Sequence, residues 1–177
     1  MERVPYVPAD LAEPAELIAA IRRRRGGALL NLDRMLLHSP PFARGWNAFL
    51  GEVRSGLTLP PAARELAMCY VAVLNGAAYE YAHHAPLYLA AGGRQAVLEA
   101  MSRGTAAPDA EGLSDDDVAL LRLTLEMTRD VQVSRTARAA AHAALGGKQA
   151  LVEFIGVVAA YNMVSRFLVA TGVSLED

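Results

Sequence analysis

The chain contains very little cysteine, because Cys69 is the only one among its 177 residues. A single thiol excludes an intrachain disulfide and any Cys-x-x-Cys pair, so neither a disulfide framework nor a dithiol redox motif is possible within one chain. Cys69 lies in an apolar stretch between Met68 and Tyr70. This position favours a buried, inert thiol over a reactive one.

The sequence also lacks a strong charge of either sign. Its 17 Lys and Arg residues against 19 Asp and Glu residues give a formal net charge of −2. That balance provides no positive field for nucleic acid, so we expect no nucleic-acid partner. The one basic cluster, the arginines at 22–25, precedes Gly26-Gly27. Cations oppose the dipole at a helix C-terminus favourably, so we interpret the cluster as a solvated helix end rather than an anion site.

Long hydrophobic runs are missing, although apolar residues make up 53% of the chain. No uninterrupted apolar run approaches the roughly 20 residues that span a bilayer, so we expect no membrane partner and assign the extra apolar surface to contacts between subunits. The N-terminal residues MERVPYVPADLAEP contain acids and prolines rather than a basic region followed by an apolar one. The sequence therefore shows no secretion or transit signal, which indicates a cytoplasmic protein.

Strand-type alternation of useful length is absent, and apolar residues recur instead at helical spacing. The length fits one domain, 1–177, with residues 1–13 as an extended N-terminal arm. Ser114 followed by three aspartates reads as a helix cap with acids opposing the dipole, not as a metal site. The fold class is all-α, with a long loop over 102–113 and helices predicted at 14–25, 29–37, from 41, from about 61 to the turn at 75–76, after that turn, and at 93–101, 115–131, 134–145 and 149–170.

The rest of the chain is organised around residues 65–88, ELAMCYVAVLNGAAYEYAHHAPLY. Asn75-Gly76 predicts a turn between two helices, because both residue types tolerate the left-handed conformation. Glu65 lies about ten residues before the turn and His84 about eight after it, so at ~1.5 Å per residue they are level to within roughly 3 Å. The stretch therefore predicts an antiparallel hairpin in which a carboxylate faces an imidazole. Pro86 should kink the second helix or end its regular part just after His84.

Polar side chains gather on the second arm of this hairpin. Glu80 and His84 are four residues apart and share a face, while Tyr79 and His83 form the neighbouring row. A Glu/His pair at this spacing is also common as a structural pair on a helix surface. Convergence with Glu65 favours function, because such a set can move protons near neutral pH.

A metal site is the competing interpretation of the same residues. Glutamate and histidine four apart can ligate one ion, but three well-placed ligands are not evident, since His38 and His142 lie on distant segments. We therefore expect no metal.

The segment RELAMCYVAVLNGAAYEYAHH resembles the signature region of the carboxymuconolactone decarboxylase family, which also contains the alkylhydroperoxidase AhpD-like proteins. The flanking segments LLHSPPFARGWNAFLGEVRSGLTLPPAARE and ALVEFIGVVAAYNMVSRFLVATGV resemble the same family, so the likeness spans residues 25–175. It implies an AhpD-like helical bundle built around the central hairpin. It also implies a homo-oligomer, commonly a trimer or a hexamer.

The AhpD-like peroxidases use a Cys-x-x-Cys pair with a glutamate, tyrosine and histidine relay. The resemblance places the relay at Glu65, Tyr79 and His84, but the cysteine positions hold Ala77 and Glu80. Neither residue can supply a thiolate or form the disulfide that closes the cycle. Dithiol peroxidase chemistry is thus excluded at this site.

The decarboxylase branch has a glutamate four residues before the histidine, which Glu80 and His84 match. The resemblance implies acid–base chemistry on a small carboxylated lactone, without a cofactor. His84 would be the proton donor or a cation facing the substrate carboxylate, tuned by Glu80, with Tyr79 and Glu65 in support.

We assign substrate binding to His83, Tyr161 and Arg166, with Arg166 supplied by the same chain or by another subunit. Arg64 is a second candidate for the arginine that faces the substrate carboxylate.

Three functions therefore stay open. The first is a lyase of the carboxymuconolactone decarboxylase type acting on a small-molecule substrate. The second is an AhpD-like, peroxiredoxin-type antioxidant protein that uses Cys69 or a partner thiol. The third is a non-catalytic oligomer that binds a small acid.

Overall fold

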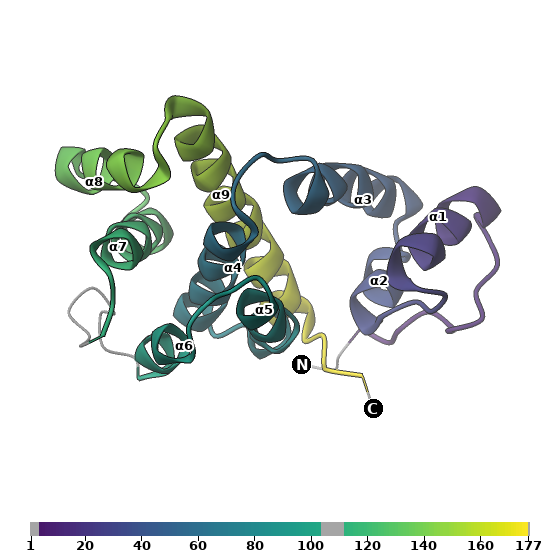
Figure 1. The fold of residues 1–177 in the computed structure, drawn as a ribbon. Coiled ribbons are helices and arrows are strands. Elements are labelled where there is room, and N and C mark those ends of the chain that lie inside the picture. Colours follow the sequence, from purple (N-terminus) through teal and green to yellow (C-terminus); the bar gives the residue numbers. More distant parts are fainter. Residues whose placement is uncertain (1–3, 104–111, 177) are drawn as a thin grey trace. The chain divides into compact units, whose positions relative to one another are not determined.

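The computed structural model describes residues 4–103 and 112–176. Within these ranges the chain forms nine α-helices and no strand, which confirms the all-α prediction (Figure 1). The predicted loop at 102–113 lies mostly outside the described residues. The helices are α1 Ala15–Arg25, α2 Asn31–Leu36, α3 Pro40–Ser55, α4 Pro61–Asn75, α5 Ala78–Ala90, α6 Gln95–Ser102, α7 Asp115–Arg129, α8 Arg135–Leu145 and α9 Lys148–Thr171.

The chain divides into two compact units, Met1–Gly56 with Leu168–Asp177, and Leu57–Phe167. The first contains α1 to α3 and the second contains α4 to α8 with most of α9. The second unit carries the predicted hairpin and therefore the candidate site. A single domain over 1–177 stays a prediction.

In the first unit, the arginines at 22–25 form the last turn of α1, which ends at Gly26 as predicted, but three of them also have protein partners. Arg24 and Arg25 pair with the buried Asp33 of α2, at 3.4 and 3.0 Å. Arg22 Nη2 donates to the carbonyl of Ala9 at 3.0 Å. The helix end was predicted correctly, but its description as solvated was incomplete, because a buried carboxylate and the N-terminal segment supply partners that local spacing does not reveal. These arginines hold α1 to its neighbours.

In the second unit, α4 and α5 form the predicted antiparallel hairpin. Gly76 ends α4 in the left-handed conformation, with φ 67°, which reverses the chain into α5. The turn is also tied to later helices, because Asn75 donates to Asn162 of α9 at 3.1 Å and Asn162 donates to Thr128 of α7 at 2.9 Å. The hairpin is thus held by helices from the second half of the chain (Figure 1).

Helix α5 continues through Pro86 to Ala90, so the alternative that its regular part ends after His84 was wrong. Pro86 and Ala82 both lie on the exposed side of the helix. Water can therefore satisfy the Ala82 carbonyl that the proline leaves without an N–H donor. The helix tolerates the proline because the lost hydrogen bond faces solvent.

Helix α7 begins with the predicted cap. Ser114 Oγ accepts a hydrogen bond from the Asp117 N–H at 3.2 Å, and the Asp117 carboxylate accepts one from the Ser114 N–H at 3.0 Å. These aspartates therefore serve the helix end. Within the described ranges, no group of three or more His, Cys, Asp or Glu residues is placed to hold a metal ion.

Helix α9 is long and apolar enough to cross a membrane by length and composition alone, although core helices pass the same test. The prediction of no membrane span was based on the absence of a long uninterrupted apolar run. The mean hydropathy of α9 is nevertheless high, because its few polar residues are outnumbered by apolar ones. Those polar residues have protein partners: Asn162 bonds α7, and Ser165 bonds Glu80 of α5. This side of α9 packs against other helices of the chain.

Candidate active site in the helical hairpin

The centre of the site is a hydrogen bond across the hairpin. Glu65, in the second turn of α4, meets His84 of α5 with 2.7 Å between Oε2 and Nδ1. Both residues are buried, with 6% and 8% of their surfaces exposed. An ionised carboxylate only accepts hydrogen bonds, so Nδ1 is the donor whenever Glu65 is ionised. The chain thus holds the imidazole in one orientation.

Two further side chains surround this pair. The His84 ring meets the ring of Tyr161 of α9 edge-on, with 5.0 Å between centroids. On the other side, Arg64 Nε lies 3.6 Å from Glu65 Oε1. This buried Nε makes no hydrogen bond among the described residues. Glu65 therefore lies between a guanidinium and an imidazole.

A second buried carboxylate lies on α5, one turn before His84. Glu80 is 2% exposed, and Ser165 Oγ of α9 donates to its two oxygens at 2.9 and 3.1 Å. Ser165 was not among the residues predicted for the site, although it is a polar residue in an otherwise apolar helix. Its polarity was the available signal. Its partner Glu80 could not be predicted, because the two residues lie 85 positions apart in the sequence.

Tyr79 and His83 form the neighbouring row, as their spacing predicted. Their rings lie 4.3 Å apart between centroids at an interplanar angle of 30°. His83 Nδ1 lies 2.8 Å from the Tyr79 carbonyl oxygen, which can only accept, so Nδ1 donates. Tyr79 is buried and His83 is half-buried. The row is ordered beside the Glu65–His84 pair.

Arg166 is oriented by its own helix instead. Its Nη1 donates to the carbonyl and to the side-chain oxygen of Asn162, at 2.9 and 2.6 Å. Of the two arginines considered for the substrate carboxylate, Arg64 is therefore the one beside the Glu65–His84 pair. Substrate binding by Arg166 stays a prediction.

Cys69 lies one turn after Glu65 on α4 and is fully buried. Burial raises the pKa of its thiol far above the ordinary value, and the carboxylates of Glu65 and Glu80 raise it further. Such a thiol stays protonated at neutral pH and is a poor nucleophile. The inert interpretation of Cys69 is supported by this environment.

Taken together, the hairpin and α9 enclose two carboxylates, one imidazole and one guanidinium among apolar neighbours. Buried charges in such a setting interact more strongly than in water and are stable only when paired. An imidazole fixed by a carboxylate can accept or donate a proton at its other nitrogen. The arrangement is suited to proton transfer and not to thiol chemistry.

Comparison with known proteins agrees with the resemblance. Residues 40–111, which include the hairpin, match the model of the Carboxymuconolactone decarboxylase family. No curated protein matches the chain by sequence.

Three solved structures share the fold. An uncharacterized peroxidase-related protein of Ralstonia eutropha JMP134, described as an alkylhydroperoxidase AhpD core, has a TM-score of 0.79 at 15% identity, covering 100% of this chain and 95% of that one. An uncharacterized peroxidase-related protein of Silicibacter sp. TM1040 has a TM-score of 0.76 at 15% identity, covering 97% and 89%. An Agrobacterium tumefaciens protein of unknown function, described as a putative antioxidant defence protein AhpD, has a TM-score of 0.71 at 17% identity, covering 81% and 96%. These likenesses establish an AhpD-like helical fold.

Proposed function

We propose that the chain is an acid–base enzyme that removes carbon dioxide from a small carboxylated lactone or a related acid, because residues 40–111 match the model of the Carboxymuconolactone decarboxylase family. The observation that carries this proposal is the buried hydrogen bond between Glu65 and His84. It supplies a buried, oriented imidazole, one helix away from a buried thiol that stays protonated at neutral pH.

The proposed decarboxylation needs a proton donor and a group that accepts the electron pair of the broken bond. When the bond between the carboxylate and the ring carbon breaks, its electrons pass into the neighbouring carbonyl system as an enolate and carbon dioxide leaves. His84 then gives a proton to carbon from Nε2, and solvent returns the proton to His84. Glu65 stabilises the imidazolium through Nδ1, and Arg64 offers a cation to the substrate carboxylate.

Glu80 has a supporting role in this proposal. Its carboxylate, held by Ser165, lies one helical turn before His84 and adds negative potential around the imidazole. Tyr79 precedes Glu80 in the sequence and is buried, and we assign its hydroxyl a supporting role as a hydrogen-bond donor.

The alternative is an AhpD-like antioxidant function, favoured by the descriptions of the proteins that share the fold. The chain's own residues argue against its dithiol form. Positions 77 and 80 hold alanine and glutamate, and the single thiol of Cys69 is buried with a strongly raised pKa. Peroxide consumption by this chain would need a thiol from a partner.

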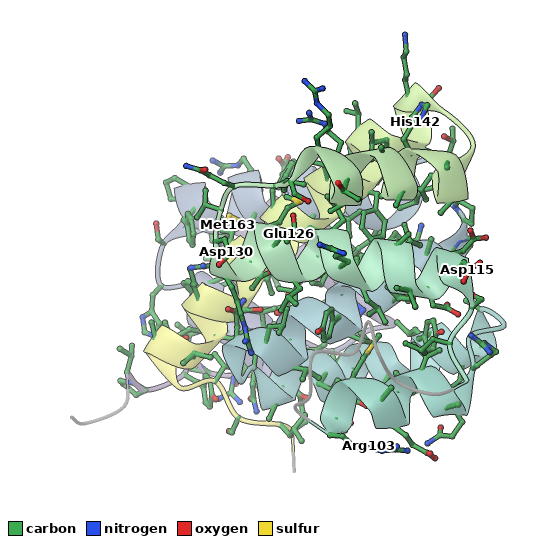
Figure 2. All side chains as sticks on the ribbon, turned by 90° about the vertical axis from the view of Figure 1, so that its left-hand side faces the viewer. Arg103, Asp115, Glu126, Asp130, His142 and Met163 are labelled. Carbon is green, nitrogen blue, oxygen red and sulfur yellow. The ribbon has the colours of Figure 1, made fainter. Side chains whose placement is uncertain are left out.

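The test offers the purified protein a panel of carboxylated lactones, β-keto acids and hydroperoxides, while carbon dioxide release and peroxide loss are followed together. We expect carbon dioxide release that His84→Gln lowers by about 10²- to 10⁴-fold, the usual contribution of a general acid. The matched control is His142→Gln, which changes an exposed histidine of α8 and should keep full activity (Figure 2).

Two outcomes would contradict the proposal. Equal turnover by wild type and His84→Gln would remove His84 from the chemistry. Binding of an acid with neither carbon dioxide release nor peroxide loss would make the protein a non-catalytic binder.

A further inference from the structure

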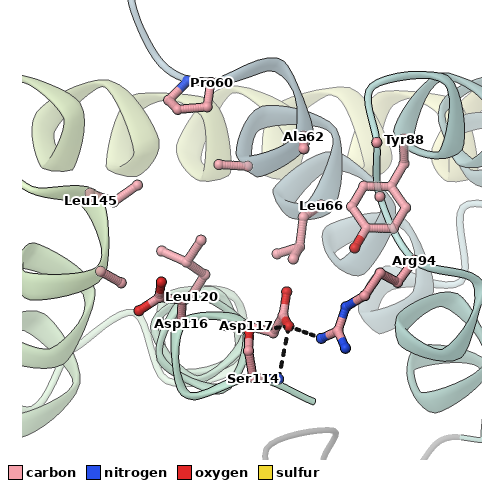
Figure 3. A pocket seen from close by; sticks show the side chains of 14 residues that line it. Pro60, Ala62, Leu66, Tyr88, Arg94, Ser114, Asp116, Asp117, Leu120 and Leu145 are labelled. Atoms are coloured by element: carbon pink, nitrogen blue, oxygen red, sulfur yellow. Dashed lines mark hydrogen bonds and ion pairs between the residues drawn. The ribbon is translucent and has the colours of Figure 1, made fainter. Parts of the chain in front are cut away.

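A pocket of about 390 Å³ lies in the second unit, apart from the Glu65–His84 pair. It is enclosed by the start of α4, the end of α5, the start of α7 and the end of α8 (Figure 3). Its volume falls within the range of small-molecule sites, about 300–1,000 Å³. None of the residues proposed for catalysis lines it.

One wall of the pocket is aliphatic. Leu66 of α4, Leu120 of α7 and Leu145 of α8 line it, together with the proline that precedes α4 and alanine side chains of α4 and α8. Leu66 and Leu120 are largely buried, so the wall is part of the packed core and keeps its shape. An apolar group placed against it is removed from water, which favours binding.

Tyr88 provides a polar point on the opposite side. The side chain is 2% exposed, and its hydroxyl points toward the space between Leu66 and Asp117 (Figure 3). Its ring is held against Gly93, where an added Cβ would come within 2.4 Å of ring carbons. The direction of the hydroxyl is thus fixed by packing.

The Tyr88 hydroxyl has a hydrogen that it can donate into the pocket. Burial raises the pKa of Tyr88, so it is an uncharged phenol at neutral pH. The Arg94 backbone N–H faces its oxygen, but among the described residues nothing accepts its hydrogen. The hydroxyl faces the pocket, so a ligand oxygen can accept its hydrogen in place of water.

The floor of the pocket is negatively charged. Asp117 is bonded to Arg94 and to Ser114, whereas Asp116 makes no hydrogen bond or ion pair within the described ranges. Two carboxylates against one guanidinium leave an excess of negative charge. A carboxylate ligand would be repelled there.

We propose that this pocket binds a small uncharged molecule with an apolar body against Leu66 and Leu120, and with a carbonyl or hydroxyl oxygen that accepts the hydrogen bond of Tyr88. The pocket discriminates against acids. The site is independent of the chemistry proposed for His84, and failure of either proposal leaves the other standing.

The test uses three probes of nearly equal size: 4-phenyl-2-butanone, butylbenzene and 3-phenylpropanoate. Dissociation constants are measured by ligand-detected NMR on the full chain. We expect the ketone to bind more tightly than the hydrocarbon by about 2- to 10-fold, the contribution of one hydrogen bond, and more tightly than the acid.

Three variants separate the parts of the proposal. Tyr88→Phe should abolish the preference for the ketone over the hydrocarbon, while Tyr81→Phe, which removes a hydroxyl of α5 bonded to Ser102, should preserve it. Leu120→Trp should fill the space and weaken all three probes. Asp116→Asn should reduce the difference between the dissociation constants of the acid and the ketone, because it removes one negative charge from the pocket.

Retained ketone preference in Tyr88→Phe, tightest binding of the acid, or no binding of any probe at millimolar concentration would overturn the proposal. Thermal unfolding of each variant verifies that it is folded.

Discussion

His84 shows how one hydrogen bond defines the chemistry of a side chain. An exposed imidazole rotates and offers either nitrogen, but His84 is held by Glu65 through Nδ1. Proton exchange with a substrate then falls to Nε2. In the proposed reaction, this hydrogen bond makes Nε2 the atom of the imidazole that exchanges a proton with the substrate.

Cys69 should be unreactive in the folded protein. Burial, and then the carboxylates of Glu65 and Glu80, raise the pKa of the thiol, so the thiolate is scarce at neutral pH. Labelling with a thiol-specific disulfide reagent at pH 7.5 should be slower than in denaturant by orders of magnitude. Native labelling as fast as that of the unfolded chain would contradict this environment.

Ser165→Ala should destabilise the protein. The change leaves the buried Glu80 carboxylate without the donor that now bonds both of its oxygens, at a cost of about 1–3 kcal/mol. Urea unfolding at pH 7 measures the difference. The matched control is Ser55→Ala, whose hydroxyl donates to the Gly51 carbonyl at an exposed position. Equal effects of the two changes would count against a structural role for the Ser165 bond.

Residue-scale prediction from the sequence was successful where spacing is local. The turn at Asn75-Gly76 fixes the register of its two arms, so counting from it was enough to bring Glu65 to His84. The contact between Glu80 and Ser165 depends on how α9 packs on the hairpin, which no local spacing encodes.

At the scale of helices, the hairpin depends on the turn that joins α4 to α5. Gly76 has φ 67°, and no atom lies within 4 Å of the place that a Cβ would take, so Gly76→Ala meets only backbone strain, about 1–2 kcal/mol. Gly156→Ala is the matched control, because it adds the same methyl to an open helical position of α9 and should stabilise by roughly 0.5–1 kcal/mol. Thermal unfolding should therefore shift in opposite directions. Shifts of the same sign would contradict the left-handed cap.

Capping residues and turn residues predicted helix boundaries correctly, but whether a proline ends a helix depends on the side of the helix on which it lies. Ser114 and Gly76 marked helix ends as predicted. Pro86 did not end α5, because its missing hydrogen bond faces water and the buried side of the helix is unaffected. The sequence identifies a proline but not the face on which it lies.

At the scale of the whole molecule, Glu153 links α9 to the segment before α4 and should make stability depend on pH. Hydrogen bonds from Gln149, and then from Thr58 and the Leu59 N–H, hold the pKa of Glu153 below its ordinary 4.5. A carboxyl with a lowered folded pKa stabilises fully above the ordinary value, and this contribution is lost as the pH falls through the folded pKa.

The variant that tests this link is Glu153→Gln. It should be less stable than wild type at pH 7, and the difference should shrink as the pH falls below 4.5, in urea unfolding at a series of pH values. Glu52→Gln changes an exposed position of α3 whose side chain makes no hydrogen bond among the described residues, and it should show no such trend. A constant difference at every pH would refute the link.

The order and class of the helices could be predicted from the sequence, because each is marked by its own periodicity and caps. The division into two compact units could not, since it depends on which helices share a core. Assembly as a trimer or hexamer stays a prediction, which the molar mass in solution will test. The chain leaves several large apolar side chains exposed, including Phe49 and Leu87, at 51% and 50%.

The proposed chemistry depends on Glu65 and His84 acting as one buried pair. A double-mutant cycle of Glu65→Leu, His84→Leu and the double variant, measured by urea unfolding, tests this dependence. Each single change leaves one polar group buried without its partner, whereas the double change removes both, so the two effects should couple by more than about 1 kcal/mol. Effects that add to within about 0.5 kcal/mol would show that the two residues do not depend on each other. That result would contradict the claim that Glu65 and His84 act as one buried pair.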